Sequence, residues 1–298
     1  MASIDNGAQA PGFYRFQLGN LRALTVNDGF FRKSGSPAEL VRNADEDAVH
    51  AALREAFLPV EHLDLLFTVP FVETPQGLAA FDIGTGGNFG PNSGKLTANL
   101  RAAGYGPEDV AHIVFTHLHV DHCSGLTDGG GQALYPRAQL HVPKPEWDYW
   151  LSEDEAARAP ADARGGFDNV RQRFAPYEGR VTLFTPGEDV LPGVRSVPTH
   201  GHTPGHTSFL VEDGGETLLV LGDVTNRPEL FLVHPDWQLV FDSDGDGAVA
   251  TRHRVLDQAV ADKLLVAAFH WPFPSLGHVA KTAGGYRMVP VVWSAEAK

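Results

Sequence analysis

The chain has 298 residues, of which 43% are hydrophobic and 20% are charged, so it can bury a large core and does not have the composition of a disordered polymer. Its 37 acidic and 23 basic side chains give a formal net charge of -14, which repels phosphate backbones and anionic lipid surfaces. Composition and charge therefore argue against nucleic acids and membranes as partners.

Local sequence features also bear on the cellular compartment. The first dozen residues, MASIDNGAQAPG, lack both the basic region and the apolar region of a signal peptide. A single cysteine, Cys123, excludes an intrachain disulfide and fits a reducing compartment. We therefore expect a cytoplasmic protein, or a periplasmic or secreted one if a signal peptide was removed.

The N-terminal part of the chain predicts strands, because short apolar or β-branched segments alternate there with turn residues. These segments are 14–18, 21–26, 63–72 and 78–83. Between them, the sequence SPAE starting at Ser36 has the N-cap, the N1 proline and the N3 glutamate of a helix start. We expect a helix from there to about Phe57.

After Gly84 the pattern changes to alternating helices and strands. The predicted helices are 95–103 and 248–261, and the predicted strands are 112–116, 194–198, 208–211, 217–221 and 264–269. No internal repeat or low-complexity linker divides the chain, so we predict a single domain over 1–298, with 1–12 as a flexible N-terminal arm. The order of elements predicts an α/β (α+β) fold, with sheets packed face to face and helices outside.

The most informative motif is HLHVDH, which directly follows an apolar strand. It contains four potential metal ligands, His117, His119, Asp121 and His122. In an extended segment every second side chain shares one side, so His117, His119 and Asp121 lie together, while a turn at Asp121 directs His122 toward a second centre. Imidazole and carboxylate are zinc-type ligands, and a site without thiolate leaves the metal a strong Lewis acid.

The alternative interpretation of this motif is a polar, exposed loop without function. Three further elements of the sequence argue against it. They are the segment HGHTPGH at 200–206, the pair Gly222 and Asp223, and His270. Each of them sits where a predicted strand runs into a loop, the usual place for functional groups on a rigid sheet.

The ordered set HxHxDH, GHTPGH, GD and a late histidine resembles the metallo-β-lactamase-fold hydrolases. Within them it is most similar to the methyl parathion hydrolase-like enzymes and the related quorum-quenching lactonases. Supporting segments include NFGPNSGKLTANLRAAGY and FHWPFPSLGHVAKTAGGYRMVPVVW, and the resemblance extends from about residue 10 to the C-terminus. It implies a four-layer αβ/βα sandwich with a two-metal site at the edges of its sheets.

The resemblance also implies which residues bind the two metals. The implied ligands are His117, His119 and His202 for one ion, Asp121, His122 and His270 for the other, and Asp223 as a bridge. The ions are expected to be divalent, zinc first, although the same ligand types accept manganese, iron or cobalt. Asp82 is expected to orient a ligand imidazole, and His206 to support the site from behind.

This constellation implies hydrolysis by an activated water. A water held between two cations loses a proton near neutral pH, and Asp121 or Asp223 can accept and return that proton. We therefore expect a binuclear metal-dependent hydrolase whose bridging hydroxide attacks a lactone or aryl ester, with promiscuous organophosphate triester hydrolysis. The alternative is a diiron or iron redox protein of the same fold, which handles oxygen or persulfide with the same ligand set. The resemblance further implies a homodimer.

For the substrate pocket, the resemblance implies aromatic walls at Phe89, Trp150 and Phe167. Such walls suit aryl groups or apolar rings. Asn226 occupies a position where related lactonases often carry a tyrosine, and its amide can donate a hydrogen bond to an oxyanion but cannot supply a proton. This departure weakens the case for homoserine lactones in particular and leaves lactone hydrolysis as a class.

Two weaker signals have simpler explanations. Cys123 directly follows His122, and we expect a buried, inert thiol there. The run DSDGDG at 242–247 copies the first half of a calcium loop, but the twelfth position is His253 where a glutamate is required, so we interpret the run as the entry to a helix.

Overall fold

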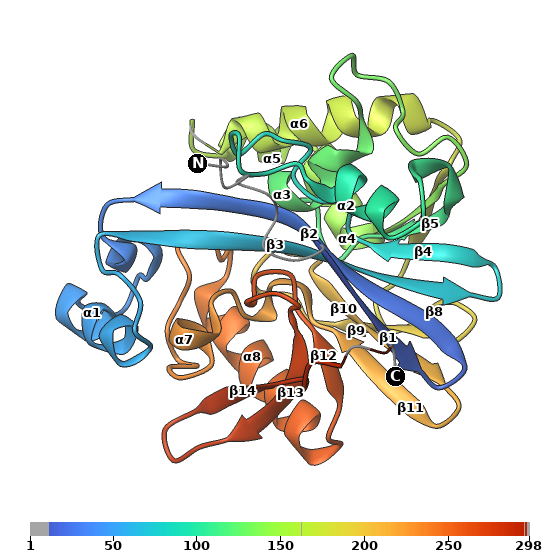
Figure 1. Cartoon of the computed structure of the whole chain (residues 1–298). Helices are drawn as coiled ribbons and strands as arrows, with labels where there is room; N and C mark the ends of the chain where they lie inside the picture. Colours follow the sequence, from blue (N-terminus) through green and yellow to red (C-terminus); the bar gives the residue numbers. More distant parts are fainter. Residues whose placement is uncertain (1–11, 162, 295, 297–298) are drawn as a thin grey trace, which may run out of the picture.

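The computed structural model describes residues 12–161, 163–294 and 296. In this part of the chain two seven-stranded sheets pack face to face, with helices on the outer face of each (Figure 1). The strand order is β1-β2-β3-β4-β5-β6-β7 in one sheet and β14-β13-β12-β11-β10-β9-β8 in the other. The predicted four-layer arrangement is confirmed. Of the predicted N-terminal arm, 1–11 lies outside the described residues.

The first half of the chain builds one sheet and the second half builds the other. The first sheet contains β1 (Phe13–Leu18), β2 (Leu21–Ser34), β3 (His62–Thr74), β4 (Gly77–Phe81), β5 (Val110–Val114), β6 (Gln139–Pro143) and β7 (Val181–Phe184). The second contains β8 (Asp189–Leu191), β9 (Val194–Pro198), β10 (Thr207–Asp213), β11 (Glu216–Val220), β12 (Leu265–Ala267), β13 (Leu276–Lys281) and β14 (Tyr286–Pro290).

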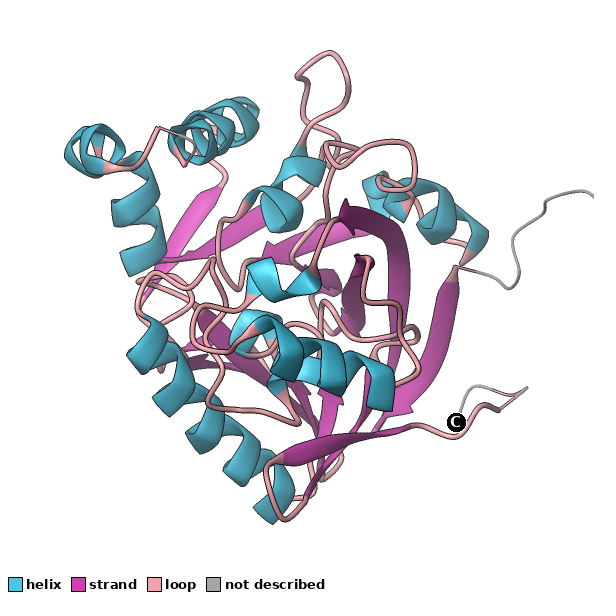
Figure 2. Cartoon of the chain, turned by 90° about the vertical axis from the view of Figure 1, so that its left-hand side faces the viewer, coloured by secondary structure: helices cyan, strands magenta, loops and turns pink. Residues whose placement is uncertain are grey.

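The helices connect and cover these strands (Figure 2). They are α1 (Glu46–Glu55), α2 (Leu96–Ala102), α3 (Val120–Cys123), α4 (Lys144–Leu151), α5 (Glu153–Arg158), α6 (Arg164–Phe174), α7 (Pro228–Phe231) and α8 (Gly245–Ala261). Among the described residues, no helix combines the length and the apolar character that a membrane crossing requires.

Alternation along the strands divides the buried apolar side chains among three cores, because successive residues of a strand point to opposite faces. In β4, Ala80 belongs to the core beneath the helices of the first half, whereas Phe81 belongs to the core between the sheets. In β11, Leu218 joins the core between the sheets and Leu219 packs with residues of α8. Both sheets are therefore buried on both faces.

The strand directions bring the functional segments to one edge of the molecule. β4 and β5 are parallel neighbours, as are β11 and β12, so the segments that follow each pair start at a common edge. Backbone hydrogen bonds join the two sheets there, from Thr68 N to the carbonyl of Phe269 and from Thr207 N to the carbonyl of Thr116, both 2.9 Å long.

The continuous helix predicted from Ser36 to about Phe57 is wrong. A short 3-10 turn at Pro37–Leu40 is followed by Val41, which is extended and forms an isolated β-bridge with Leu239. The helix α1 then begins anew, because the side chain of Asp45 caps its first turn. A tertiary contact in the second half of the chain thus interrupts a locally favourable helix.

A histidine pair on β5 and β6 makes the stability of the fold depend on pH. His112 Nδ1 lies 3.1 Å from His141 Nε2. Burial lowers the pKa of both imidazoles, that of His141 to about 4. Because the folded state favours the neutral rings, their contribution to stability is complete above the ordinary histidine pKa of 6.5 and is lost as the pH falls toward about 4.

We therefore expect His141→Gln to lose less free energy of unfolding than the wild type between about pH 7 and about pH 5. Urea unfolding of the two metal-free proteins at each pH measures the difference. An equal loss in both proteins would contradict the assignment of this pH dependence to the histidine pair.

Candidate metal centre

The seven residues predicted as metal ligands meet at the common edge of the two sheets. They form three overlapping groups whose ligand atoms lie within 4.8 Å of one another: His117, His119 and His202; His117, His122 and Asp223; and Asp121, His122 and His270. They reach this edge from four separate segments, which follow β5, β9, β11 and β12. The structure thus brings all seven together, and metal binding by them stays a prediction.

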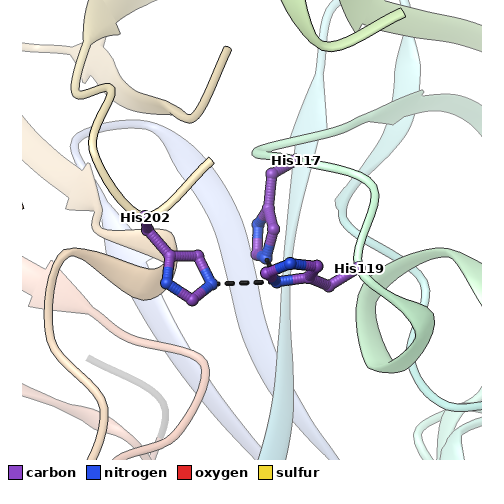
Figure 3. A group of neighbouring side chains, drawn as sticks. All are labelled: His117, His119 and His202. Atoms are coloured by element: carbon purple, nitrogen blue, oxygen red, sulfur yellow. Dashed lines mark hydrogen bonds between the residues drawn. The ribbon is translucent and has the colours of Figure 1, made fainter. Parts of the chain in front are cut away.

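Three imidazoles form the first group (Figure 3). His119 Nδ1 lies 3.0 Å from His117 Nε2 and 2.9 Å from His202 Nε2, so one nitrogen of each ring faces a common point. The remaining nitrogens of two rings are held from behind. His117 Nδ1 lies 2.9 Å from the hydroxyl of Thr116, and His202 Nδ1 lies 2.8 Å from a carboxylate oxygen of Asp242.

We call Asp121, His122 and His270 the second ligand group, which combines two imidazoles and a carboxylate. The extended spacing predicted to place Asp121 beside His117 and His119 is wrong: the backbone enters α3 directly after His119, so Asp121 lies with His122 and His270. The ring of His122 still lies against that of His117, with centroids 4.0 Å apart. One oxygen of Asp121 lies 3.7 Å from His122 Nε2 and 3.5 Å from His270 Nε2. Behind the rings, His122 Nδ1 contacts Asp82 at 2.9 Å and His270 Nδ1 contacts the carbonyl of Leu66 at 2.8 Å.

Asp223 lies between the two groups. Its carboxylate is 3.4 Å from His202 Nε2 in the first group, and 3.3 Å and 3.1 Å from the Nε2 atoms of His122 and His270 in the second. A short 3-10 turn at Gly222–Val224, directly after β11, brings it there. This is the geometry expected of a bridging carboxylate.

His206 supports Asp223 through the backbone. Its Nε2 accepts a hydrogen bond from the N–H of Asp223 at 2.9 Å, and its Nδ1 lies 2.8 Å from the hydroxyl of Thr199. Gly222 has a φ of +60°, and a Cβ there would lie 2.6 Å from the His206 ring, so the turn requires glycine. Burial, with the nearby charge of His202, lowers the pKa of His206 to about 3, so the ring is neutral and can accept this bond.

Asp82 fixes the segment after β5. It follows β4, has a φ of +63° and is buried. Its two oxygens accept hydrogen bonds from the backbone N–H and the hydroxyl of Thr116, at 2.8 Å and 2.7 Å, while the second oxygen also faces His122. Asp82 therefore occupies the position predicted for a residue that orients a ligand imidazole.

The electrostatics of the cluster keep two of its imidazoles neutral, while Asp223 and His122 are charged. Burial and neighbouring imidazoles lower the pKa of His117 and His119 well below the usual range, which keeps both rings neutral. Against the effect of burial, His270 and His122 hold the pKa of Asp223 well below its usual range, so its carboxylate is ionised. Burial opposes a charge on His122 as well, but the surrounding carboxylates, Asp223 first, raise its pKa well above 6.5.

Two buried atoms at the centre, His122 Nε2 and Asp223 Oδ1, lie 3.3 Å apart and form no aligned hydrogen bond with each other or with another group of the described residues. A buried polar atom without a partner costs free energy, so such pairs of atoms indicate a ligand. Neutral imidazoles and ionised carboxylates are the donor set that divalent transition metals accept. The residues present therefore fit metal ions at this place.

A cavity of about 470 Å³ opens onto the cluster. Its apolar wall consists of Phe31, Leu65, Phe67, Phe89, Val120 and Phe241. Its polar lining consists of Lys33, His119, Asp121, His202, Asp223, Asn226 and His270. The cavity thus combines an apolar wall with polar groups at one end, as ligand sites do.

The predicted pocket residues divide into two sets. Phe89 and Asn226 line the cavity, as expected. Trp150 and Phe167 do not line it, so the prediction that they form pocket walls is wrong. They are buried against each other, with their ring centroids 4.8 Å apart. Trp150 instead packs edge-on with His119, with ring centroids 5.6 Å apart, and its indole donates a hydrogen bond to Glu146. It therefore supports the proposed ligands from the interior.

The sequence patterns do not identify two carboxylates that support the proposed ligands, Asp242 and Glu146. Asp242 belongs to the run interpreted as a helix entry, and the helix cap is in fact Asp244, whose side chain accepts a hydrogen bond from the first turn of α8. Asp242 orients His202, 40 residues away in the chain. The local signal is the same for both aspartates, so only the tertiary structure separates their roles.

These two aspartates give a matched pair of variants. We expect Asp242→Asn to weaken metal binding about 10- to 100-fold, because the neutral amide is a weaker acceptor for the His202 ring and turns an NH2 group toward that ring or toward the N–H of Leu239. Asp244→Asn is the control, since asparagine also caps helices and, among the described residues, the side chain of Asp244 bonds only to Gly247 of α8. Competition with a chromophoric chelator measures both affinities. Equal affinities in the two variants would refute the role of Asp242.

Comparison with known proteins places these residues in a family. The family model described as the metallo-beta-lactamase superfamily matches residues 71–270, a range that contains all seven clustered residues. An N-acyl homoserine lactonase of a Bacillus species is 27% identical over 193 residues, 58% of this chain and 69% of the relative. The same enzyme of Bacillus thuringiensis is 24% identical over 193 residues with the same coverage.

Solved structures share the fold over nearly the whole chain. The hydrolase AbOPH of the beta-lactamase superfamily has a TM-score of 0.90 and 29% identity, covering 96% of this chain and 100% of its own. AidC, a dizinc quorum-quenching lactonase solved with its product N-hexanoyl-L-homoserine, has a TM-score of 0.89 and 23% identity, covering 95% and 98%. The second likeness speaks for the fold alone.

Proposed function

Since the chain belongs to the metallo-beta-lactamase superfamily, we propose that it is a hydrolase with two divalent metal ions, zinc being the expected metal. The observation that carries the proposal is the pair of ligand groups that share Asp223 at the mouth of an apolar cavity. The residues that would hold the ions are His117, His119 and His202 for one, Asp121, His122 and His270 for the other, and Asp223 for both.

The chemistry divides between the ions and the chain. When bound, divalent ions at such a site acidify water and polarise a carbonyl or phosphoryl oxygen. Asp121, whose side chain is 18% exposed, lines the cavity and can take the proton of the attacking water and return it to the leaving oxygen. Asp82 and the Leu66 carbonyl hold the imidazoles of His122 and His270 in one orientation meanwhile.

Water as the nucleophile is consistent with the state of the cysteine. Cys123 is buried within the core under the first sheet, and burial raises the pKa of its thiol. A thiol of this kind is not ionised at neutral pH and does not act as a nucleophile. The predicted burial of Cys123 is confirmed, and its inert role stays a prediction.

The cavity favours a neutral substrate with an apolar part. Phe89 packs against Phe31 and Phe67 with ring centroids 5.7 Å and 5.4 Å apart, which forms an aromatic wall. Lys33 contributes little positive charge, because it forms an ion pair with Glu39 at 2.5 Å. Asn226 lines the cavity, and its buried Oδ1 has no hydrogen-bond partner among the described residues, which leaves an acceptor there for an N–H or O–H of a substrate.

We therefore propose a lactone or an aryl ester as substrate, with organophosphate triesters as side substrates. The similarity to N-acyl homoserine lactonases supports the lactone class, and the aromatic wall fits either an acyl chain or an aryl leaving group. The site uses the same groups for attack on carbon or on phosphorus, which supports the triester side reaction.

A hydrolysis panel on the metal-loaded protein tests this proposal. It contains dihydrocoumarin, acyl homoserine lactones of increasing chain length, an aryl acetate, methyl paraoxon and a β-lactam. We expect a lactone or the aryl ester to have the highest kcat/KM, and KM to fall as the acyl chain grows, because each buried methylene contributes about 0.8 kcal/mol.

Asp223→Ala serves as the control in this panel, since loss of the shared carboxylate should abolish both metal binding and hydrolysis. No hydrolysis by a protein that carries two metals per chain would contradict the proposal. Colour and a reversible redox response in that protein would favour the alternative iron protein instead.

A further inference from the structure

Glu146 on α4 is fully buried, and among the described residues none of its hydrogen bonds goes to a proposed ligand side chain. Its carboxylate accepts three N–H hydrogen bonds. One oxygen accepts from the backbone of Leu118 at 3.1 Å and from the indole of Trp150 at 2.7 Å, and the other accepts from the backbone of Gly205 at 2.9 Å. Burial raises the pKa of this carboxyl and the hydrogen bonds oppose that rise, so the buried oxygens depend on these donors and losing one would be costly.

The three donors connect Glu146 to the first ligand group from two sides. Leu118 lies between the two histidines that follow β5, and Gly205 lies in the loop that carries His202. The indole of Trp150 meets the edge of the His119 ring, with centroids 5.6 Å apart. A single carboxylate thus joins both loops that supply the three imidazoles of Figure 3.

The loop of His202 also lies directly against α4. A Cβ at Gly205 would come within 2.2 Å of the backbone nitrogen of Glu146, which is closer than any side chain fits. The backbone contact and the hydrogen bond at 2.9 Å act at the same point. The first turn of α4 therefore fixes how near this loop can approach the segment after β5.

The second ligand group has different supports. His122 is held by Asp82 and His270 by the carbonyl of Leu66. Within the described part of the chain, the hydrogen bonds of Glu146 reach neither of these supports nor the group itself. Disturbing Glu146 should therefore change one metal site and spare the other.

We propose that Glu146 is a positioning residue that sets the separation of the two loops bearing His117, His119 and His202, and thereby the metal affinity of this site alone. The proposal rests on the proposed function, because it takes metal binding by these residues as given. Its physical basis is that ligands lose affinity when the groups that hold them in place are removed.

Cobalt(II) titration of the metal-free protein tests the proposal, with visible absorption reporting coordination. In Glu146→Gln the amide keeps one acceptor oxygen but turns an NH2 group toward an N–H donor, so one loop is released. We expect one ion to bind as in the wild type and the other about 10- to 100-fold more weakly. Glu153→Gln is the matched control, since Glu153 on α5 is 85% exposed.

Single-site backgrounds identify which ion is weakened. In His270→Ala, where the first group remains, adding Glu146→Gln should weaken cobalt binding by the same factor. In His202→Ala, where the second group remains, adding it should change nothing. Equal weakening in both backgrounds, or no weakening in either, would overturn the proposal.

A milder variant keeps the test valid if Glu146→Gln does not unfold cooperatively. Trp150→Phe removes one donor and leaves the carboxylate and both backbone contacts, so we expect a smaller loss of cobalt affinity confined to the same site. Unchanged affinity in this variant would then overturn the proposal. Because cobalt binding is measured without substrate, a wild type that binds two ions but hydrolyses nothing would refute the proposed hydrolase and leave the role of Glu146 intact.

Discussion

Asp223 places an ionised carboxylate in the interior of the protein, 3.1 to 3.4 Å from imidazole nitrogens of three different loops. Burying a carboxylate is costly unless positive charge compensates for it. The surrounding rings do so in part: burial keeps His117 and His119 neutral, whereas, against the effect of burial, nearby carboxylates raise the pKa of His122 and His202. The proposed pair of divalent ions would replace the protons on these rings as the compensating charge.

The fold meets this requirement with short segments on rigid supports. The ligand segments follow strands that end at a common edge between the sheets, and the backbone bonds between Thr68 and Phe269 and between Thr116 and Thr207 fix the sheets relative to one another. Different carboxylates behind the cluster hold different ligands or loops in place. Asp82 orients His122, Asp242 orients His202, and Glu146 joins two loops through their backbones. The proposed metal geometry is therefore set in advance, before any ion binds.

The sequence predicts those features of the fold and the site that depend on patterns of neighbouring residues. The HxHxDH segment after an apolar strand identifies the first proposed ligands by residue type, but the strand spacing assumed for it misplaced Asp121, because the segment lies beyond β5 and turns into α3. The sequence does not predict contacts between residues that are far apart in the chain. Glu146 bonds to Leu118 and Gly205, which lie 28 and 59 residues away, and Asp242 looks like the neighbouring cap Asp244. Contacts between distant residues also explain two other wrong predictions. The bridge between Val41 and Leu239 interrupts the predicted helix, and Trp150 packs against His119 in the interior instead of lining the pocket.

Anomalous X-ray diffraction from crystals of the zinc-loaded protein, recorded on both sides of the zinc absorption edge, tests the central claim most directly. We predict two ions. One lies about 2.0 to 2.2 Å from ring nitrogens of His117, His119 and His202, the other at similar distances from Asp121, His122 and His270, and both contact Asp223. A single ion, or two ions that do not share Asp223, would contradict the view that this buried carboxylate organises a binuclear centre.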